Sequence, residues 1–378
     1  MATNRKRVLL VSNVVMHYRV SVYNYLSRRF AEHGWEWMVL TDEVQSQNRL
    51  APQFPLEVIP FRFSAYRRRI KALNPDAVIL FLHLKDRMLW PLIHWLKWSH
   101  IPVAEWTKTR NLDDVDNVVK NAMFSYIHWL SDGLILYSGD LVRYLSAAQR
   151  RKAFAANNTI NHEEFPPVIE SKAEIKARLK IPFKKVVLFV GRMDVDGGRK
   201  RVDYLIEIFR DLEGHDAGLV IVGAGMKPEW QARINPRTTV YLGEIHDPEN
   251  REIARIFTMA DVCAIPGHVG LGLNQALFYG LPVVTMEGKH PPEIAFLHHG
   301  RNGYMVPAGD RGQLRARILE LLDDDLLRER FSVAAREGFL REASIEGMFQ
   351  GFRQCLAFIH PDPAALSVSD DSAKGGQP

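Results

Sequence analysis

The stretch that decides the fold is VVLFVGRMDVDGGRKRVDYLI, residues 186–206. It begins as a continuous apolar run, passes through a loop rich in glycine and cations, and predicts a helix from about Val202. An apolar run of strand length is typical of a strand covered on both faces in a parallel sheet. A glycine-bearing loop before a helix N-terminus favours anion binding, because free backbone N–H groups and the helix dipole point at the ligand.

Two cations flank this loop, Arg192 and Lys200. A diphosphate could lie between them, held by charge-assisted hydrogen bonds. The sequence contains neither GxGxxG nor GxxxxGK[ST], so this is neither a dinucleotide fingerprint nor a P-loop. A solvated basic turn is the alternative interpretation.

Strand and helix patterns alternate on both sides of this stretch and predict two parallel, doubly wound sheets. Expected strands lie at 7–13, 37–41, 56–60, 76–82, 101–105 and 133–138, and again at 184–190, 218–222, 239–242, 261–265 and 282–285. We therefore expect an α/β protein with two Rossmann-like domains facing across a cleft, since ligands bind at the carboxyl ends of such strands. The predicted parts are domains 1–165 and 166–345, a C-terminal helix 346–360 that could cross back to the first domain, and a disordered tail 361–378.

A second informative segment is DVCAIPGHVGLGLNQALFYGLPVVT, residues 261–285. A strand is followed by Gly270 and Gly272, which allow a ligand to approach the backbone closely. A helix is expected from about 271 to 279. Gln275 lies one turn into it and could reach a sugar or ribose hydroxyl, although an exposed helix residue is the alternative.

These segments resemble the donor half of the family 4 (group 1) retaining glycosyltransferases, which have the GT-B fold. The similar motifs span residues 157–340 and are Gly191-Arg192 with Lys200 and 202–206, Gly270-Leu271 with 280–284, Pro292-Glu293-Ile294, Gly300 with 302–304, and 161–165. The resemblance implies that the donor is a nucleotide-diphosphate sugar. It also implies donor contacts from Gly191, His268, Val269, Gly270, Leu271, Gln275 and Glu293.

The sequence departs from that family at one important place. The family's donor helix usually carries two glutamates, the first for the transferred sugar and the second for the ribose. Gly267 and Gln275 stand at these positions. Gln275 can still hydrogen-bond a ribose, less strongly than a carboxylate would. His268 or Glu293 could replace the first glutamate, or the sugar could be a 6-deoxyhexose that lacks the hydroxyl.

The first domain is expected to hold the acceptor. Its candidate acceptor-binding residues lie at predicted strand ends and are His17, Tyr18, Arg19, Lys85 and Lys108. His83 follows the strand at 76–82, and the resemblance implies that a histidine near this place touches the donor sugar. A structural or surface histidine is the alternative.

Composition suggests where the protein works. Residues 1–152 contain 22 Lys and Arg against 13 Asp and Glu, together with seven of the eight tryptophans. This combination suits an anionic membrane surface, although core tryptophans under a basic surface would give the same composition. No nucleic-acid-binding motif of the usual kinds is present. Two cysteines and no apolar stretch of spanning length predict a cytoplasmic protein at the inner face of the membrane.

The sequence therefore predicts a retaining hexosyltransferase that transfers a hexose or 6-deoxyhexose to a lipid-linked or saccharide acceptor in polysaccharide or glycolipid assembly. Arg192, Lys200 and His83 are the expected catalytic residues. In the mechanism implied by the resemblance, the leaving phosphate accepts the acceptor's proton, so no cofactor or metal is expected. The alternatives are a sugar-nucleotide 2-epimerase of the same fold and a non-catalytic partner subunit that binds the nucleotide sugar.

Overall fold

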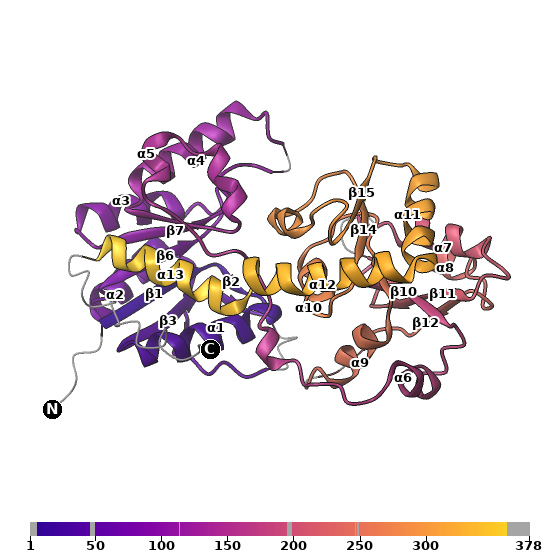
Figure 1. Cartoon of the computed structure of the whole chain (residues 1–378). Helices are drawn as coiled ribbons and strands as arrows, with labels where there is room; N and C mark the ends of the chain where they lie inside the picture. The colour runs from indigo at the N-terminus through magenta and orange to yellow at the C-terminus, as the bar shows by residue number, and fades with distance from the viewer. Residues whose placement is uncertain are drawn as a thin grey trace, which may run out of the picture. The chain divides into compact units, whose positions relative to one another are not determined.

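The computed structural model describes residues 6–45, 50–112, 114–194, 199–245, 247 and 249–360, and the chain forms two compact units (Figure 1). The first unit combines Met1–Asn157 with Glu346–Pro378, and the second is Asn158–Ile345. The division thus falls upstream of the predicted 165/166 boundary, while the C-terminal helix belongs to the first unit. The predicted tail 361–378 and the glycines at 197 and 198 lie outside the described residues.

The first unit contains a seven-stranded parallel sheet in the order β5-β3-β1-β6-β7-β8-β9. Its strands are β1 (Lys6–Ser12), β3 (Trp35–Thr41), β5 (Leu56–Val58), β6 (Ala77–Phe81), β7 (Val103–Thr107), β8 (Gly133–Leu136) and β9 (Ala153–Ala155). A short parallel ladder joins β2 (Val14–Val15) to β4 (Glu43–Val44). The strand order reverses between β1 and β6, the position at which doubly wound sheets place their ligand.

The helices of the first unit connect these strands. They are α1 (His17–Glu32), α2 (Phe63–Leu73), α3 (Leu89–Trp98), α4 (Val118–Leu130), η1 (Gly139–Tyr144), α5 (Ala147–Arg150) and the C-terminal α13 (Ile345–Ile359). The yellow ribbon of α13 lies beside the strands of this unit although it is last in the chain (Figure 1).

Aromatic residues hold α13 against the first unit. Phe30 stacks on Trp37 with ring centroids 5.3 Å apart, and Phe349 of α13 meets the Phe30 ring edge-on at 5.1 Å. Glu346 accepts hydrogen bonds from Tyr25 at 2.7 Å and from the Arg29 guanidinium at 3.0 Å. These contacts bury large apolar rings and add charge-assisted hydrogen bonds, so α13 is part of this unit's core.

The seven tryptophans of the first unit differ in burial, and Trp90 is partly buried. Four are buried in the core: Trp35, Trp37, Trp95 and Trp106. Trp98 and Trp129 are instead exposed at the surface. Core packing therefore explains most of the tryptophan enrichment, and the interfacial interpretation applies to the exposed pair.

The second unit contains a six-stranded parallel sheet in the order β12-β11-β10-β13-β14-β15. The strands are β10 (Lys185–Val190), β11 (Ala217–Val222), β12 (Thr239–Tyr241), β13 (Val262–Ala264), β14 (Val283–Met286) and β15 (Gly303–Val306). The helices are η2 (His162–Glu164), α6 (Lys172–Arg178), α7 (Val202–Arg210), α8 (Pro228–Gln231), α9 (Arg251–Met259), α10 (Leu271–Phe278), η4 (Pro292–Phe296), α11 (Arg311–Asp323) and α12 (Asp325–Glu342). The order reverses between β10 and β13.

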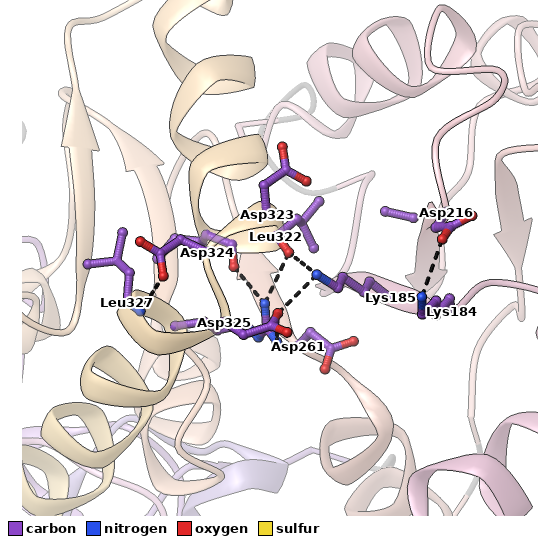
Figure 2. A network of polar contacts seen from close by, with 12 residues as sticks. Lys184, Lys185, Asp216, Asp261, Leu322, Asp323, Asp324, Asp325 and Leu327 are labelled. Atoms are coloured by element: carbon purple, nitrogen blue, oxygen red, sulfur yellow. Dashed lines mark hydrogen bonds and ion pairs between the residues drawn. The ribbon is translucent and has the colours of Figure 1, made fainter.

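A polar network surrounds the start of β10 in this sheet (Figure 2). Lys185 bonds the Leu322 carbonyl and the Asp325 carboxylate, and Lys184 pairs with Asp216 at 3.5 Å. Hydrogen bonds from Lys185 and Arg328 lower the pKa of Asp325 to about 2. The network ties β10 to the junction of α11 and α12.

Within the described residues, no helix combines the length and apolar character that crossing a bilayer requires.

Candidate functional site

The candidate donor site lies at the carboxyl ends of β10 and β13, which are neighbours at the reversal point of the second sheet. Val187 and Leu188 pair with Val262 and Cys263, so both strands deliver their following loops to one edge. The two segments singled out in the sequence are therefore brought together by the topology.

Backbone hydrogen bonds join these two loops directly. The Gly267 N–H donates to the Lys200 carbonyl and the His268 N–H donates to the Arg199 carbonyl, each at 3.0 Å. A Cβ at position 267 would overlap the Arg199 carbonyl oxygen. The loop approach therefore requires glycine here, which explains in physical terms why the family's usual glutamate is absent.

The Lys200 side chain extends from the first of these loops to the second. Its ammonium donates to the His268 carbonyl at 3.0 Å and to the Val269 carbonyl at 3.2 Å. Burial lowers the pKa of Lys200 to about 8, and burial raises the pKa of the nearby Cys263 thiol to about 12. At neutral pH the ammonium therefore stays charged beside a thiol that stays protonated.

The absence of a side chain at Gly191 makes room for the Lys200 side chain. A Cβ at position 191 would lie 2.7 Å from both Cδ and Cε of Lys200, so the methylene chain passes directly over the end of β10. Arg192, the next residue, is exposed and pairs with Asp194 at 3.2 Å. These contacts of Arg192 and Lys200 are thus to different groups, Arg192 to a carboxylate and Lys200 to two backbone carbonyls, and the predicted diphosphate site between the two cations stays a prediction.

The helix α10 begins directly beyond the Lys200 contact. Gly270 is its N-cap, with φ of 58°, and Leu271 is its first residue. Val269 is fully buried in the apolar core, so only its backbone faces the Lys200 ammonium. Gln275 lies partly buried one turn along the helix. The N–H groups in the first turn of α10 and the Lys200 ammonium therefore lie at the same end of the sheet.

Glu293 lies beside the segment where the chain enters the second unit. The residue is buried, and its carboxylate accepts a hydrogen bond from the Asn158 amide. Asn274 of α10 donates to the Asn158 carbonyl at 3.0 Å. Glu293 therefore anchors the entry segment to α10 and η4, and its contact with the donor stays a prediction.

A pocket of about 250 Å³ opens over the carboxyl ends of β13 and β14. Its lining includes Gly267 and His268, which sequence reasoning identified, together with Arg199, Arg201, Lys289 and His290, which it did not single out. Lys289 and His290 follow β14 as Gly267 follows β13, so applying the strand-end rule to β14 would have found them. The pocket carries a cationic lining that suits an anionic ligand.

In the first unit, the three candidates at the start of α1 have different surroundings. His17 is exposed and its Nδ1 lies 3.0 Å from the Gln45 side-chain oxygen, and Tyr18 is exposed beside it. Arg19 is buried, and its guanidinium donates to the Tyr137 hydroxyl at 3.0 Å. Four rings surround that guanidinium: Tyr18, Phe81, Trp106 and Tyr137. Arg19 therefore packs inside an aromatic enclosure, and its predicted contact with the acceptor stays a prediction.

His83 lies in the turn that follows β6, where its backbone N–H donates to the Asp86 carboxylate at 2.7 Å. Partial burial lowers the pKa of His83, with Lys108 and Lys85 acting in the same direction and Asp86 opposing them. Lys108 extends over the Tyr137 ring at 5.4 Å. The three predicted residues therefore share one edge of the first sheet, with a neutral imidazole among ammonium groups at pH 7.

Solved structures share this architecture. HepE from Anabaena in complex with UDP superposes with a TM-score of 0.73 at 14% identity, covering 93% of this chain and 99% of that chain. WaaG, a glycosyltransferase involved in lipopolysaccharide biosynthesis, gives 0.64 at 14% identity, with coverages of 94% and 100%. A putative UDP-N-acetylglucosamine 2-epimerase from Listeria monocytogenes gives 0.63 at 13%, with coverages of 93% and 95%. The fold class is GT-B, with two Rossmann-like domains.

Residues 184–324, which lie within the second unit, match the family model described as glycosyl transferases group 1. A phosphatidyl-myo-inositol mannosyltransferase of Mycobacterium leprae is 30% identical over 165 residues, 42% of each chain. The sulfoquinovosyl transferase SQD2 of Arabidopsis thaliana is 26% identical over 226 residues, 57% of this chain and 42% of that relative. The chain spans less than half the length of these two relatives.

Proposed function

We propose that this protein is a glycosyltransferase that uses a nucleotide-diphosphate sugar as donor. The observation that carries the proposal is the partly buried Lys200 ammonium, held between the loops after β10 and β13 inside the part that matches the family model. A diphosphate that displaces the carbonyl contacts of Lys200 would meet this cation and the first-turn N–H groups of α10. Arg192 would complete the site by leaving its partner Asp194.

The chemistry that this arrangement suits is departure of a nucleoside diphosphate. As the bond between the sugar's anomeric carbon and the diphosphate oxygen breaks, negative charge grows on that oxygen. Lys200 and the helix N-terminus stabilise it where it develops. The acceptor hydroxyl forms the new bond to the anomeric carbon, and its proton passes to the leaving phosphate. Retention of configuration and metal independence are part of the proposal.

The donor sugar is proposed to be a hexose or 6-deoxyhexose. Position 267 leaves no room for the carboxylate that would usually hold a sugar hydroxyl, and His268 lines the neighbouring pocket. A sugar without that hydroxyl would leave no polar group unpaired there. The acceptor is assigned to the first unit, whose strand-end loops carry Lys85 and Lys108, two cations that suit a lipid-linked phosphate or diphosphate.

A donor assay with the purified protein tests the proposal. UDP-, GDP- and dTDP-sugars are first screened by thermal shift, since a ligand that binds only the folded state raises the midpoint. The stabilising donor is then incubated with the protein, with and without a saccharide acceptor. Release of nucleoside diphosphate supports a transferase. An isomerised donor would instead identify the 2-epimerase alternative, and binding without turnover the partner-subunit alternative.

A further inference from the structure

An exposed apolar face runs along α4 in the first unit. Val118, Val119, Tyr126 and Trp129 are all exposed, and their spacing places them on one side of the helix. Val118 and Trp129 are 78% and 69% exposed. Because these side chains span the helix from its first residue nearly to its last, the face follows its whole length.

Two further aromatic side chains are exposed on neighbouring helices. Trp98, the last residue of α3, is 79% exposed, and Phe358 of α13 is 54% exposed. Tyr126 links α4 to α3 through a 2.9 Å hydrogen bond from its hydroxyl to His94 Nε2, and its ring lies against Trp129 at 5.9 Å. We call the set Trp98, Val118, Val119, Tyr126, Trp129 and Phe358 the α3–α4 face.

A pocket of about 400 Å³ lies among these aromatic groups. Trp129 and Phe358 line it together with three cationic side chains, Lys97, Arg151 and Lys152. Lys97 pairs with Asp132, and Lys152 donates to the Trp129 carbonyl at 3.4 Å. The pocket's side-chain charge is therefore positive after Asp132 is counted. It opens beside two rings, Trp129 and Phe358, that stay exposed although each packs against one other ring.

This combination has a specific physical meaning. Tryptophan and tyrosine favour the boundary between water and lipid, where the ring is in an apolar environment and the polar tip stays hydrated. Lysine and arginine next to such rings are attracted to anionic lipid headgroups. Aliphatic side chains such as Val118 and Val119 suit acyl chains, whereas nucleic-acid-binding surfaces mainly contact phosphates and sugars through polar groups.

We propose that the α3–α4 face docks onto an anionic lipid bilayer, with Trp98, Trp129 and Phe358 entering the interface and the pocket of Lys97, Arg151 and Lys152 receiving a phosphate headgroup. A second copy of the chain fits the face less well, since a symmetric pairing would place the same cations opposite one another. The inference deepens the proposed function, because the expected lipid-linked acceptor resides in a membrane. The biological role of this docking rests on the proposed function, whereas the binding of the α3–α4 face to a bilayer does not depend on it.

Vesicle co-sedimentation of the full chain, without any donor, tests the proposal. Vesicles of phosphatidylcholine mixed with phosphatidylglycerol are compared with phosphatidylcholine alone, at low and high salt. The double variant Trp98→Ser/Trp129→Ser should bind the anionic vesicles at least about tenfold more weakly than wild type. Leu326→Ser removes an equally exposed apolar side chain from α12 and should bind like wild type.

Charge is tested separately. Arg151→Glu should weaken binding by about fivefold or more for each unit of charge changed, and this loss should shrink at high salt. Lys184→Glu, which alters an exposed lysine at the amino-terminal edge of the second sheet, is the matched control and should bind like wild type. Excess inorganic phosphate at constant ionic strength should release a small part of the protein from anionic vesicles, because it competes with the lipid headgroup for the pocket.

Tryptophan fluorescence provides a readout that folding defects would not imitate. Anionic vesicles should shift the emission of the wild type to shorter wavelength, and this shift should be lost in the double variant while its circular dichroism is unchanged. The proposal is overturned if the wild type ignores anionic vesicles at low salt, if the double variant binds equally well, or if the face proves to be covered in a dimer. Vesicle binding by a protein that recognises no nucleotide sugar would instead refute only the proposed function.

Discussion

Gly267→Ala is the substitution that tests the geometry of the donor site most directly. The new Cβ would overlap the Arg199 carbonyl oxygen, so the two loops must separate. Such overpacking costs about 1–3 kcal/mol. The two backbone hydrogen bonds between these loops, each 3.0 Å long, contribute about 1 kcal/mol apiece and would be stretched as well. We expect the free energy of unfolding to fall by about 2–4 kcal/mol in total.

Gly288→Ala is the matched control, because position 288 lines the same pocket and a Cβ there would meet nothing within 4 Å. For a unit of this size, differential scanning fluorimetry should show a midpoint lower by roughly 5–15 °C for Gly267→Ala and little change for Gly288→Ala. The loss should also weaken donor binding, since Lys200 is held by the loop that moves. Equal midpoints for the two variants would refute the claim that close backbone approach requires glycine at 267.

Three further outcomes are expected. Lys200→Ala should lower turnover at least about tenfold, or about 1.4 kcal/mol of transition-state stabilisation, in assays of nucleoside diphosphate release, with Lys184→Ala as control; a near-normal rate would remove Lys200 from the diphosphate site. The folded pKa of Lys200, about 8, lies below its ordinary 10.5, so the unfolded chain holds more protons between these values. The free energy of unfolding should therefore rise with pH across that window relative to Lys200→Met. Denaturant titrations at several pH values that give both proteins the same pH dependence of this free energy would contradict the expectation. Burial raises the pKa of Glu105 from 4.5 to about 8, so the free energy of unfolding should fall as pH rises between these values. Glu105→Gln should remove this part of the pH dependence in the same titrations.

The sequence predicted the strands at the centre of each sheet because buried parallel strands are continuous apolar runs. It missed the two-residue strands β2 and β4, and also β9 and β15, which lie at the sheet edges. Length alone does not account for this, since β5 and β12 have three residues each and were predicted.

The site was predictable to the extent that it depends on strand ends. The loops around Lys200 and Gly267 follow adjacent strands and meet as expected. The burial of Arg19 and Glu293 was not predictable, because a charged residue in a loop or at a helix start is usually exposed. Their burial depends on an aromatic enclosure and on Asn158, partners that are distant in the chain. The cationic pocket beyond β14 could have been predicted, because Lys289 and His290 follow a recognisable strand.

The return of α13 to the first unit has a consequence for how the protein is made. Phe349 and Phe352 complete a core whose other rings, Phe30 and Trp37, leave the ribosome more than three hundred residues earlier. The second unit is synthesised in between as an uninterrupted segment and can fold during translation, whereas the first must wait for the closing helix. Until then its unfinished apolar surface is exposed in the cell, so premature termination ahead of Ile345 should yield an aggregation-prone fragment rather than a working half.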